Sequence, residues 1–558
     1  MKELLNKLGE NKNIFYSKKE SWWLIGFSML LSSSIMIEPQ LICSSLLKGQ
    51  LSDMWLYWSA IIGSAFSVSF FAHLWKNVPV KTENEFLFFR YSGQGAKLLH
   101  TFRSLYLGLL ILPFIISFSL LAFSKILCFI IGIEINFAIV ILTFLFIFLS
   151  FFNSFRQRLK LDFFLFIVFI VLFLSIIISL FLNTGGLSHL ATTVQSSKTS
   201  CNIIPAIGSK TFNAFIVFIL VQWWSASILD YPDMNGQKLM ATNTSKDLLK
   251  SVFIPSLSIV LFRVVLFTLP FMAVCYGYAN SSVDGELAFT SLFIKVLPSW
   301  MLVLVVGIFL IPFLSFVQNT QNWGGSLLIQ NFYKHTFNPN LTDSKTKKFG
   351  IIAMIYIIIV SGIIAINSDS LIGITKYIFA LTAGVGPVFM LRWYWWRINA
   401  WSQLSAMLAA LVYPPILDWL YNNNNNTYQF ISQLERNYNM DYYPVKIVIL
   451  TIIVSLTWLT ITFLTAPTEN EVLQTFASTI RPGGFWKPFK NSGKTFSKLR
   501  LFAWLLQTGN GFLLYFIFWN FLIGNYIQFI GLLLLFILVF FISYKLIQKA
   551  NFNYDLEL

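Results

Sequence analysis

Residues 22–47 read WWLIGFSMLLSSSIMIEPQLICSSLL, an apolar run interrupted near its middle by a serine triplet and by the pair Glu38–Pro39. A helix of about 20 apolar residues crosses the roughly 30 Å hydrocarbon core of a bilayer. A carboxylate and a proline inside such a run predict a helix that is broken within the membrane. Broken helices are tolerated at that depth only where they are buried in protein or line a cavity. The stretch therefore predicts a membrane helix that contributes to a site.

A second interrupted run lies at residues 211–241, where ASILDYPDMNG occupies 226–236. It falls five apolar segments after the first, and this odd offset would place it in the opposite orientation. Inverted repeats with matched broken helices are typical of secondary transporters, which bind their substrate between the repeats. Proline and glycine are common in membrane helices, so either break alone would be ordinary. Their occurrence together predicts repeat one at about 21–183 and repeat two at about 211–396.

The composition places the whole chain in a membrane. Of its 558 residues, 56% are apolar and only 11% are charged, which is more apolar sequence than a soluble surface tolerates. We expect an all-α polytopic protein of about 14 helices. The predicted segments are 21–47, 54–76, 104–130, 136–153, 161–183, 211–241, 251–278, 297–330, 349–367, 371–396, 399–421, 444–466, 506–524 and 527–547.

The formal net charge of +16 comes from Lys and Arg that are spread over short loops. A nucleic-acid surface would need them on one soluble face, so no nucleic-acid partner is expected. The basic residues gather in the loops on one side of the predicted segments, which predicts a multi-pass plasma (inner) membrane protein with both termini cytoplasmic. The expected layout is a cytoplasmic segment at 1–20, a core at 21–396, additional helices at 397–548 and a cytoplasmic tail at 549–558.

The sequence gives no support for an enzyme. It contains no GxxxxGK[ST] loop, so the chain alone would not pump by hydrolysing ATP, and no nucleophile and base are paired. The run Asn422–Asn426 is expected to be a solvated spacer in an outer loop. No cofactor is expected other than Na+ as a coupling ion.

Two charges stand out inside apolar segments. Glu38 lies in the first break, where an unpaired carboxylate would be costly, so we expect it to face the bundle and not lipid. Arg263 lies within SIVLFRVVLF, and a structural ion pair and a functional role remain open for it. Asp230, in the second break, is expected either to contact a ligand or to sit in a hydrated gap.

Residues 392–407, RWYWWRINAWSQLSAM, resemble the signature RWYWWRINAWSE of a bacterial branch of the sodium:solute symporter family. Further similar pieces are WWLIGFSM at 22–29, RYSGQGAKLLHTFRSLYLGLLI at 90–111, QWW at 222–224 and QNWGGSLLIQNFYKHTF at 321–337. The resemblance implies a leucine-transporter-like core of five plus five inverted helices, alternating access, and cotransport of sodium with a small organic solute.

The chain departs from the family pattern at three places. Ile37 stands where the family branch has an Asp, and Gln403 where the signature has Glu. The family places two consecutive hydroxyl residues in the eighth helix to help bind sodium, and the matching positions are Ser315 and Phe316. A phenyl ring offers no oxygen to a hard cation. The resemblance thus implies a sodium position near Ser315 and Ser32 that Phe316 weakens.

We expect an ion-coupled secondary transporter that imports a small organic solute, with sodium as coupling ion and protons as the other possibility. The alternative is a transport-deficient homologue that acts as a membrane sensor or envelope-complex subunit. The substrate and the oligomeric state do not follow from the sequence. Predicted substrate-binding residues are Ser33, Ser34, Glu38, Gln222, Trp223, Trp224, Ser227 and Asp230, and Arg263 and Arg392 are predicted structural or coupling charges.

Overall fold

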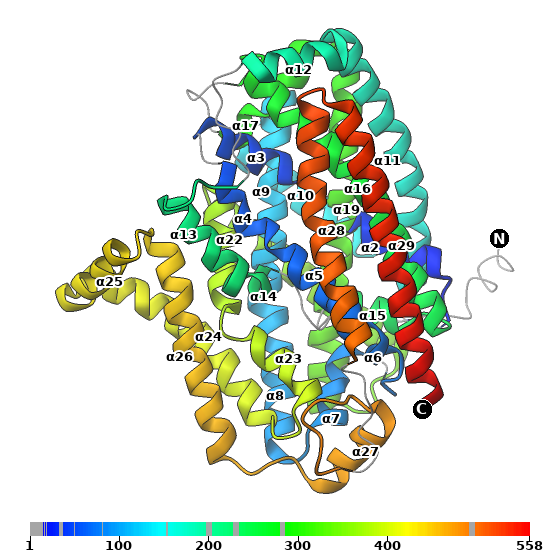
Figure 1. Cartoon of the computed structure of the whole chain (residues 1–558). Helices are drawn as coiled ribbons and strands as arrows, with labels where there is room; N and C mark the ends of the chain where they lie inside the picture. Colours follow the sequence, from blue (N-terminus) through cyan, green and yellow to red (C-terminus); the bar gives the residue numbers. More distant parts are fainter. Residues whose placement is uncertain are drawn as a thin grey trace, which may run out of the picture.

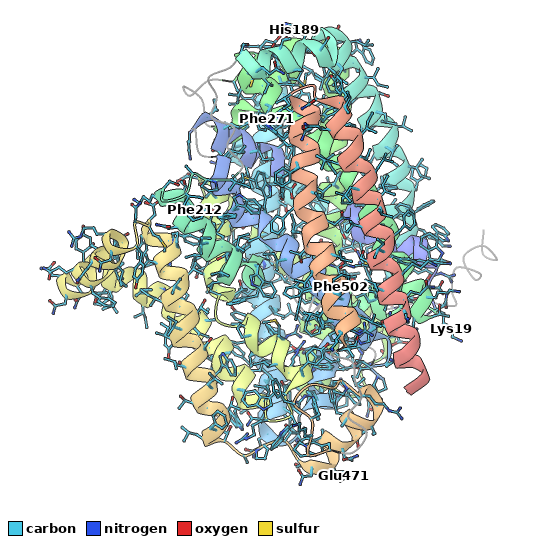
Figure 2. The ribbon with its side chains drawn as sticks, in the orientation of Figure 1. Lys19, His189, Phe212, Phe271, Glu471 and Phe502 are labelled. Carbon is cyan, nitrogen blue, oxygen red and sulfur yellow. The ribbon has the colours of Figure 1, made fainter. Side chains whose placement is uncertain are left out.

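The computed structural model describes residues 15, 17, 19–32, 37–48, 51–80, 82–151, 154–196, 204–226, 234–279, 285–489 and 497–557, without the side chains of 52–53, 225–226, 234, 254–265 and 552–557. These residues form helices joined by short loops, and the long helices run side by side as one bundle (Figure 1). His189 on α12 (Gly186–Ser196) and Glu471 on α27 (Asn470–Ile480) mark opposite ends of the bundle (Figure 2). We call them the α12 end and the α27 end.

All fourteen predicted segments are helical in the described part of the chain. Nine helices there are long and apolar enough to cross a membrane, and five shorter apolar helices accompany them. The segments are, in order, α2 and α3 (Trp22–Leu31, Glu38–Leu47); α4, α5 and α6 (Trp55–Trp58, Ala60–Phe70, Ala72–Lys76); α8, η4 and α9 (Gly93–Leu105, Tyr106–Ile111, Leu112–Ile131); α10 (Ile135–Leu149); α11 (Phe155–Asn183); α13, η5, α14 and α15 (Lys210–Val217, Phe218–Gln222, Trp223–Ala226, Met234–Met240); α16 (Ser245–Cys275); α19, η6 and α20 (Ser299–Gly325, Ser326–Tyr333, Lys334–Thr336); α21 (Asp343–Ile366); α22 and α23 (Leu371–Thr382, Gly386–Tyr394); α24 (Ala400–Asn423); α26 (Tyr442–Leu464); α28 (Lys498–Leu522); and α29 (Tyr526–Glu557).

Large apolar side chains cover the outside of the bundle. Phe144, Val303 and Leu464 are 66%, 73% and 77% exposed, and similar residues line α11, α28 and α29. An apolar surface of this extent is not stable in water. It fits a polytopic protein whose helices face lipid.

The structure describes one helix on each side of both predicted breaks, while residues 33–36 and 227–233 lie outside the described residues. In the first segment α2 ends at Leu31 and α3 begins at Glu38. In the sixth, α14 ends at Ala226 and α15 begins at Met234. The sixth segment also contains a π-helical stretch, η5, a feature that frequently marks functional sites.

The connections are more helical than predicted. The Asn422–Asn426 run is exposed, as predicted, but it is not a loop: α24 ends at Asn423, and Asn424 caps α25 (Asn425–Asn437) by accepting a hydrogen bond from the Thr427 N–H. Figure 1 shows α25 projecting sideways from the bundle. The predicted tail at 549–558 is helical where the structure describes it, because α29 continues to Glu557, and its place in the cytoplasm stays a prediction. The remaining short helices are η2 (Leu51–Met54), η3 (Glu83–Glu85), α7 (Phe86–Arg90), α17 (Gly285–Ala288) and α18 (Ser291–Val296).

At the α12 end, a buried ion pair joins three elements. Lys125 on α9 places its Nζ 2.5 Å from Oε2 of Glu286 on α17, and both side chains are about 4% exposed. Oε1 of Glu286 accepts a hydrogen bond from the backbone N–H of Leu371, the first residue of α22. A carboxylate at a helix N-terminus is favoured by the helix dipole. This contact fixes α17 over the ends of α9 and α22.

At the α27 end, Arg90 organises the RWYWWRI motif. Its fully buried guanidinium donates from Nε to the carbonyl of Arg392 (2.7 Å) and from Nη2 to those of Trp395 and Ile398 (3.1 Å each). Carbonyls at a helix C-terminus lack partners within the helix, and one planar guanidinium satisfies several at once. The rings of Tyr91, Phe476 and Trp486 lie 5.0 to 5.2 Å from the guanidinium carbon.

Replacing Arg90 with Lys should therefore destabilise the fold, because an ammonium group cannot reach three separate carbonyls. We expect a loss of about 2 kcal/mol, seen as a lower apparent unfolding temperature of the detergent-purified protein. Arg436→Lys on the exposed face of α25 is the matched control and should leave the temperature unchanged. Equal shifts for both variants would contradict the assignment.

Candidate functional site

A cavity of about 570 Å³ lies inside the bundle. Its walls come from α3, α4, α5, α9, α16, α19 and α22, and from the hairpin α28–α29. The residues that α28 contributes, between 507 and 515, occupy the middle of that 25-residue helix. The cavity is therefore near half height, the depth at which secondary transporters bind their substrates.

Glu38 is one of the residues that line this cavity. It is the first residue of α3, directly after the first break, and its side chain is partly buried. The predicted orientation of Glu38, toward the bundle and away from lipid, is confirmed. It is the acidic group among the described lining residues, which include no basic side chain.

The rest of the lining combines aromatic rings with a few polar groups. Tyr57 lies 5.9 Å from the ring of Phe379, and Trp58 lies 4.4 Å from that of Tyr515, measured between centroids. The polar lining residues other than Glu38 and these aromatics are Ser64, Thr375, Gln507 and Asn510. Apolar walls with few convergent polar groups are typical of small-molecule sites.

The two predicted sodium residues belong to one buried hydrogen-bond network. Ser32 donates to the carbonyl of Ser28 (2.7 Å), and the Ser28 hydroxyl donates to Oδ2 of Asp162 on α11 (2.5 Å). Asn319 on α19 donates both to the same Asp162 oxygen (3.1 Å) and to the carbonyl of Ser315 (2.8 Å). The network therefore joins the first, fifth and eighth segments where the resemblance implies a cation.

A lysine also reaches this network. Nζ of Lys238, on α15 after the second break, donates to the Ser32 hydroxyl at 3.1 Å. Lys238 is 1% exposed and Ser32 is 2% exposed. A positive charge of the protein thus lies on the hydroxyl that was predicted to help bind Na+. Both broken segments meet at this contact.

Phe316 and Ile37, two of the departures from the family pattern, face the same small cavity of about 30 Å³. Phe316 also lines the large cavity. The small cavity has mostly apolar walls, with Gln40 and Ser119 as its polar residues. Ile37 and Phe316, which stand where the resemblance implies an Asp and a hydroxyl, therefore line the same small cavity.

Gln222, Trp223 and Trp224 have packing roles. Gln222 is fully buried in η5 and its amide lies against the phenol of Tyr443. Trp224 donates from Nε1 to the carbonyl of Ala383 (2.7 Å), between α22 and α23. The Trp223 ring packs against Phe66 and Trp504. These contacts tie the sixth segment to the second, tenth, twelfth and thirteenth, and ligand binding by the three residues stays a prediction.

Arg392 lies away from the cavity lining, in the aromatic cluster at the α27 end. It is fully buried, with its guanidinium carbon 4.8 Å from the ring centre of Phe86 and 4.9 Å from that of Phe389. This geometry favours the structural role that was left open for it. The backbone of Arg263 is in α16, and its side chain is outside the described set. Ser33, Ser34, Ser227 and Asp230 lie outside the described residues altogether.

Sequence reasoning missed Asp162, Lys238, Asn319, Gln507 and Asn510. Asp162 offered a signal, because it is a lone carboxylate at the start of a long apolar run. Lys238 was counted among the basic loop residues that indicate orientation. The amides on α28 carried no signal, since single amides are frequent in membrane helices.

One solved structure is described as the substrate-bound outward-open state of a Na+-coupled sialic acid symporter. It matches this chain with a TM-score of 0.61 and 15% sequence identity, over 82% of this chain and 93% of that chain. At this identity the likeness shows the fold, and the leucine-transporter-like class is confirmed. Comparison with curated protein sequences gives no match.

The family model for the sodium:solute symporter family matches residues 27–410, which is more than two thirds of the sequence. The match includes both predicted breaks, Glu38, the Ser32–Ser315 network and the RWYWWRI motif. This places the chain among transporters and not among enzymes. The chain belongs to the sodium:solute symporter family.

Proposed function

We propose that the chain is an ion-coupled secondary transporter that imports a small organic solute by alternating access. The observation that carries this proposal is the cavity of about 570 Å³ at half height, with Glu38 of the broken first helix in its wall. A filled core would instead have favoured the transport-deficient sensor or complex subunit. The cavity supports transport.

The contacts at the two ends of the bundle suit alternating access. At the α12 end, the Lys125–Glu286 pair holds α17 against α9 and α22. A second group of contacts lies around the first break. The Ser28–Asp162 hydrogen bond holds α2 to α11, and the Lys238–Ser32 hydrogen bond holds it to α15. For a solute to reach the cavity from one end of the bundle, some of these contacts must break. Each contact is polar and discrete, so it can act as a two-state latch.

Sodium is the proposed coupling ion, through a site that is weaker than the family pattern implies. Ser315, Ser28 and Asp162 supply oxygens near the expected position, whereas Phe316 and Ile37 remove two polar groups. The Lys238 ammonium on Ser32 adds a positive charge that opposes a second cation. Protons remain the other coupling ion, with Glu38 as the group that would carry them.

We place the protein in the bacterial plasma membrane with the α27 end in the cytoplasm. Support comes from the basic residues of the loops at that end, which the positive-inside rule assigns to the cytoplasm. Both termini would then be cytoplasmic, and the α12 end with the Lys125–Glu286 pair would face outward.

The proposal is tested with the purified protein. Candidate solutes are first found by their effect on the unfolding temperature, and the uptake of a radiolabelled hit is then measured in proteoliposomes. We expect accumulation under an inward sodium or proton gradient and none under an equal potassium gradient. A folded protein that binds the solute but never accumulates it under any gradient would overturn the proposal.

Replacing Phe316 with Ser should strengthen sodium binding, because it restores a hydroxyl next to Ser315. Binding of ²²Na+ to the detergent-purified protein is the measurement, and we expect at least about a tenfold gain in affinity, equivalent to about 1.4 kcal/mol. Phe313→Ser, a buried phenylalanine one turn earlier on α19, is the control for a simple loss of packing. Tight native binding that Phe316→Ser leaves unchanged would refute a weakened site.

Replacing Glu38 with Gln separates the two coupling ions. If Glu38 carries protons, uptake of the identified solute should lose its pH dependence while the unfolding temperature stays within a few degrees. Glu134→Gln, at the exposed start of α10, is the control. Unaltered pH dependence in Glu38→Gln would assign coupling to sodium alone.

A further inference from the structure

The hairpin α28–α29 forms one wall of the central cavity, although it lies outside the residues that match the family model. Its lining residues are Gln507, Asn510, Gly511, Leu514, Tyr515, Phe536 and Phe540. The hairpin is held firmly in place. Arg500 donates to the carbonyls of Ser69 (3.0 Å) and Ala550 (3.4 Å), and Trp504 donates to that of Ile62 (3.2 Å).

Helix α28 packs closely against α5, and this packing turns the polar face of α28 toward the cavity. A Cβ added at Gly511 would lie 2.2 Å from Cγ2 of Ile61, so only glycine permits this spacing. Gln507 and Asn510 are three residues apart and therefore share the helix face that Gly511 sets against the cavity.

Each amide leaves one polar atom without a partner. Asn510 donates from Nδ2 to the carbonyl of Phe536 (3.2 Å), while its buried Oδ1 has no hydrogen bond among the described residues. The Oε1 of Gln507 accepts from Ser69 (3.4 Å), while its buried Nε2 is likewise unpaired. The pair thus offers one acceptor and one donor. Buried polar atoms are costly to leave unsatisfied, and a bound solute would satisfy them.

Other groups in the cavity wall define the rest of the proposed binding surface. The Trp58 indole N–H also lines the cavity without a hydrogen-bond partner in the described part of the chain, and the Tyr57 hydroxyl lies there hydrogen bonded to the Thr375 side chain. Aromatic rings of Phe118, Phe316, Phe379 and Tyr515 surround this group. No Lys or Arg side chain belongs to the described lining, so the recognised group does not need to be an anion.

We propose that Gln507 and Asn510 determine solute specificity by hydrogen bonding an uncharged donor–acceptor group, a carboxamide or a hydroxyl, on a solute with an aromatic or apolar body. This inference rests on the proposed transport function and names its substrate class. Recognition is then shared between the family core, which supplies Glu38 and the aromatic rings, and a hairpin that the family model does not cover.

The test compares two probes that share one body. 3-Phenylpropanamide carries the carboxamide, and n-propylbenzene lacks it. Binding to the full-length purified protein is followed by tryptophan fluorescence, with Trp58 in the cavity wall, and by equilibrium dialysis. We expect the native chain to bind the amide at least about tenfold more tightly than the hydrocarbon, as one or two hydrogen bonds would give.

Gln507→Met and Asn510→Leu keep the side-chain volume and remove the unpaired atoms. Each should weaken binding of the amide about tenfold and leave binding of the hydrocarbon unchanged. Asn520→Leu is the control, because that amide, on the same helix, bonds to the Phe516 carbonyl of its own helix. Gly511→Ala should weaken both probes, since it pushes α28 away from α5.

Three results would overturn the inference: no preference of the native chain for the amide, equal weakening of both probes in the Gln507 and Asn510 variants, or an effect of Asn520→Leu as large as theirs. Native-like elution and unfolding temperature of the variants show that the fold is kept. The outcomes separate the two proposals. If the variants alter probe binding but no uptake is seen, the inference about Gln507 and Asn510 is supported and the transport proposal is refuted. If uptake is seen but the variants leave probe binding unaltered, transport is supported and the inference is refuted.

Discussion

A helix that breaks inside a membrane leaves backbone and side-chain polar groups that only the protein can satisfy. The structure meets this constraint at the first and sixth segments by bringing them together. Ser32, which follows the first half-helix, is hydrogen bonded to Lys238 from the other broken segment, and Ser28, within that half-helix, is hydrogen bonded to Asp162 from the fifth. The large cavity lies beside this contact on the first segment only, since Glu38 at the start of α3 is in its wall and no described residue of the sixth segment is.

The same constraint bears on two departures from the pattern that the resemblance implies. Ile37 and Phe316 are far apart in the sequence and share the wall of one small cavity. Losing the hydroxyl alone would leave an unpaired carboxylate in a dry space, and losing the carboxylate alone would leave a cation position with too few oxygens. Replacing both removes the conflict. The remaining polar groups lie on the Asp162 side, where Lys238 contributes the positive charge.

The fold could be predicted from the sequence because the signals for membrane helices are local. Apolar runs of membrane length, basic loops and paired interruptions each report on a few neighbouring residues, and all fourteen segments are helical where the chain is described. Glu38 could be predicted to face the cavity from its energetic cost alone. The hydrogen-bond partners of Ser28 and Ser32 could not be predicted, because they lie far away in the sequence. Asp162 is 134 positions from Ser28, and Lys238 is 206 positions from Ser32. Arg392 was ambiguous for the opposite reason: a buried arginine looks the same in sequence whether it contacts a ligand or packs among aromatic rings.

The place of the hairpin in the chain bears on how the protein is made. Residues up to 410, which contain the family core, leave the ribosome well before α28 and α29. During synthesis the core is therefore made before one wall of its cavity. The amides, the glycine and the rings of residues 507–540 arrive afterwards and close it. A chain that ends before residue 498 thus lacks the α28–α29 wall of the cavity.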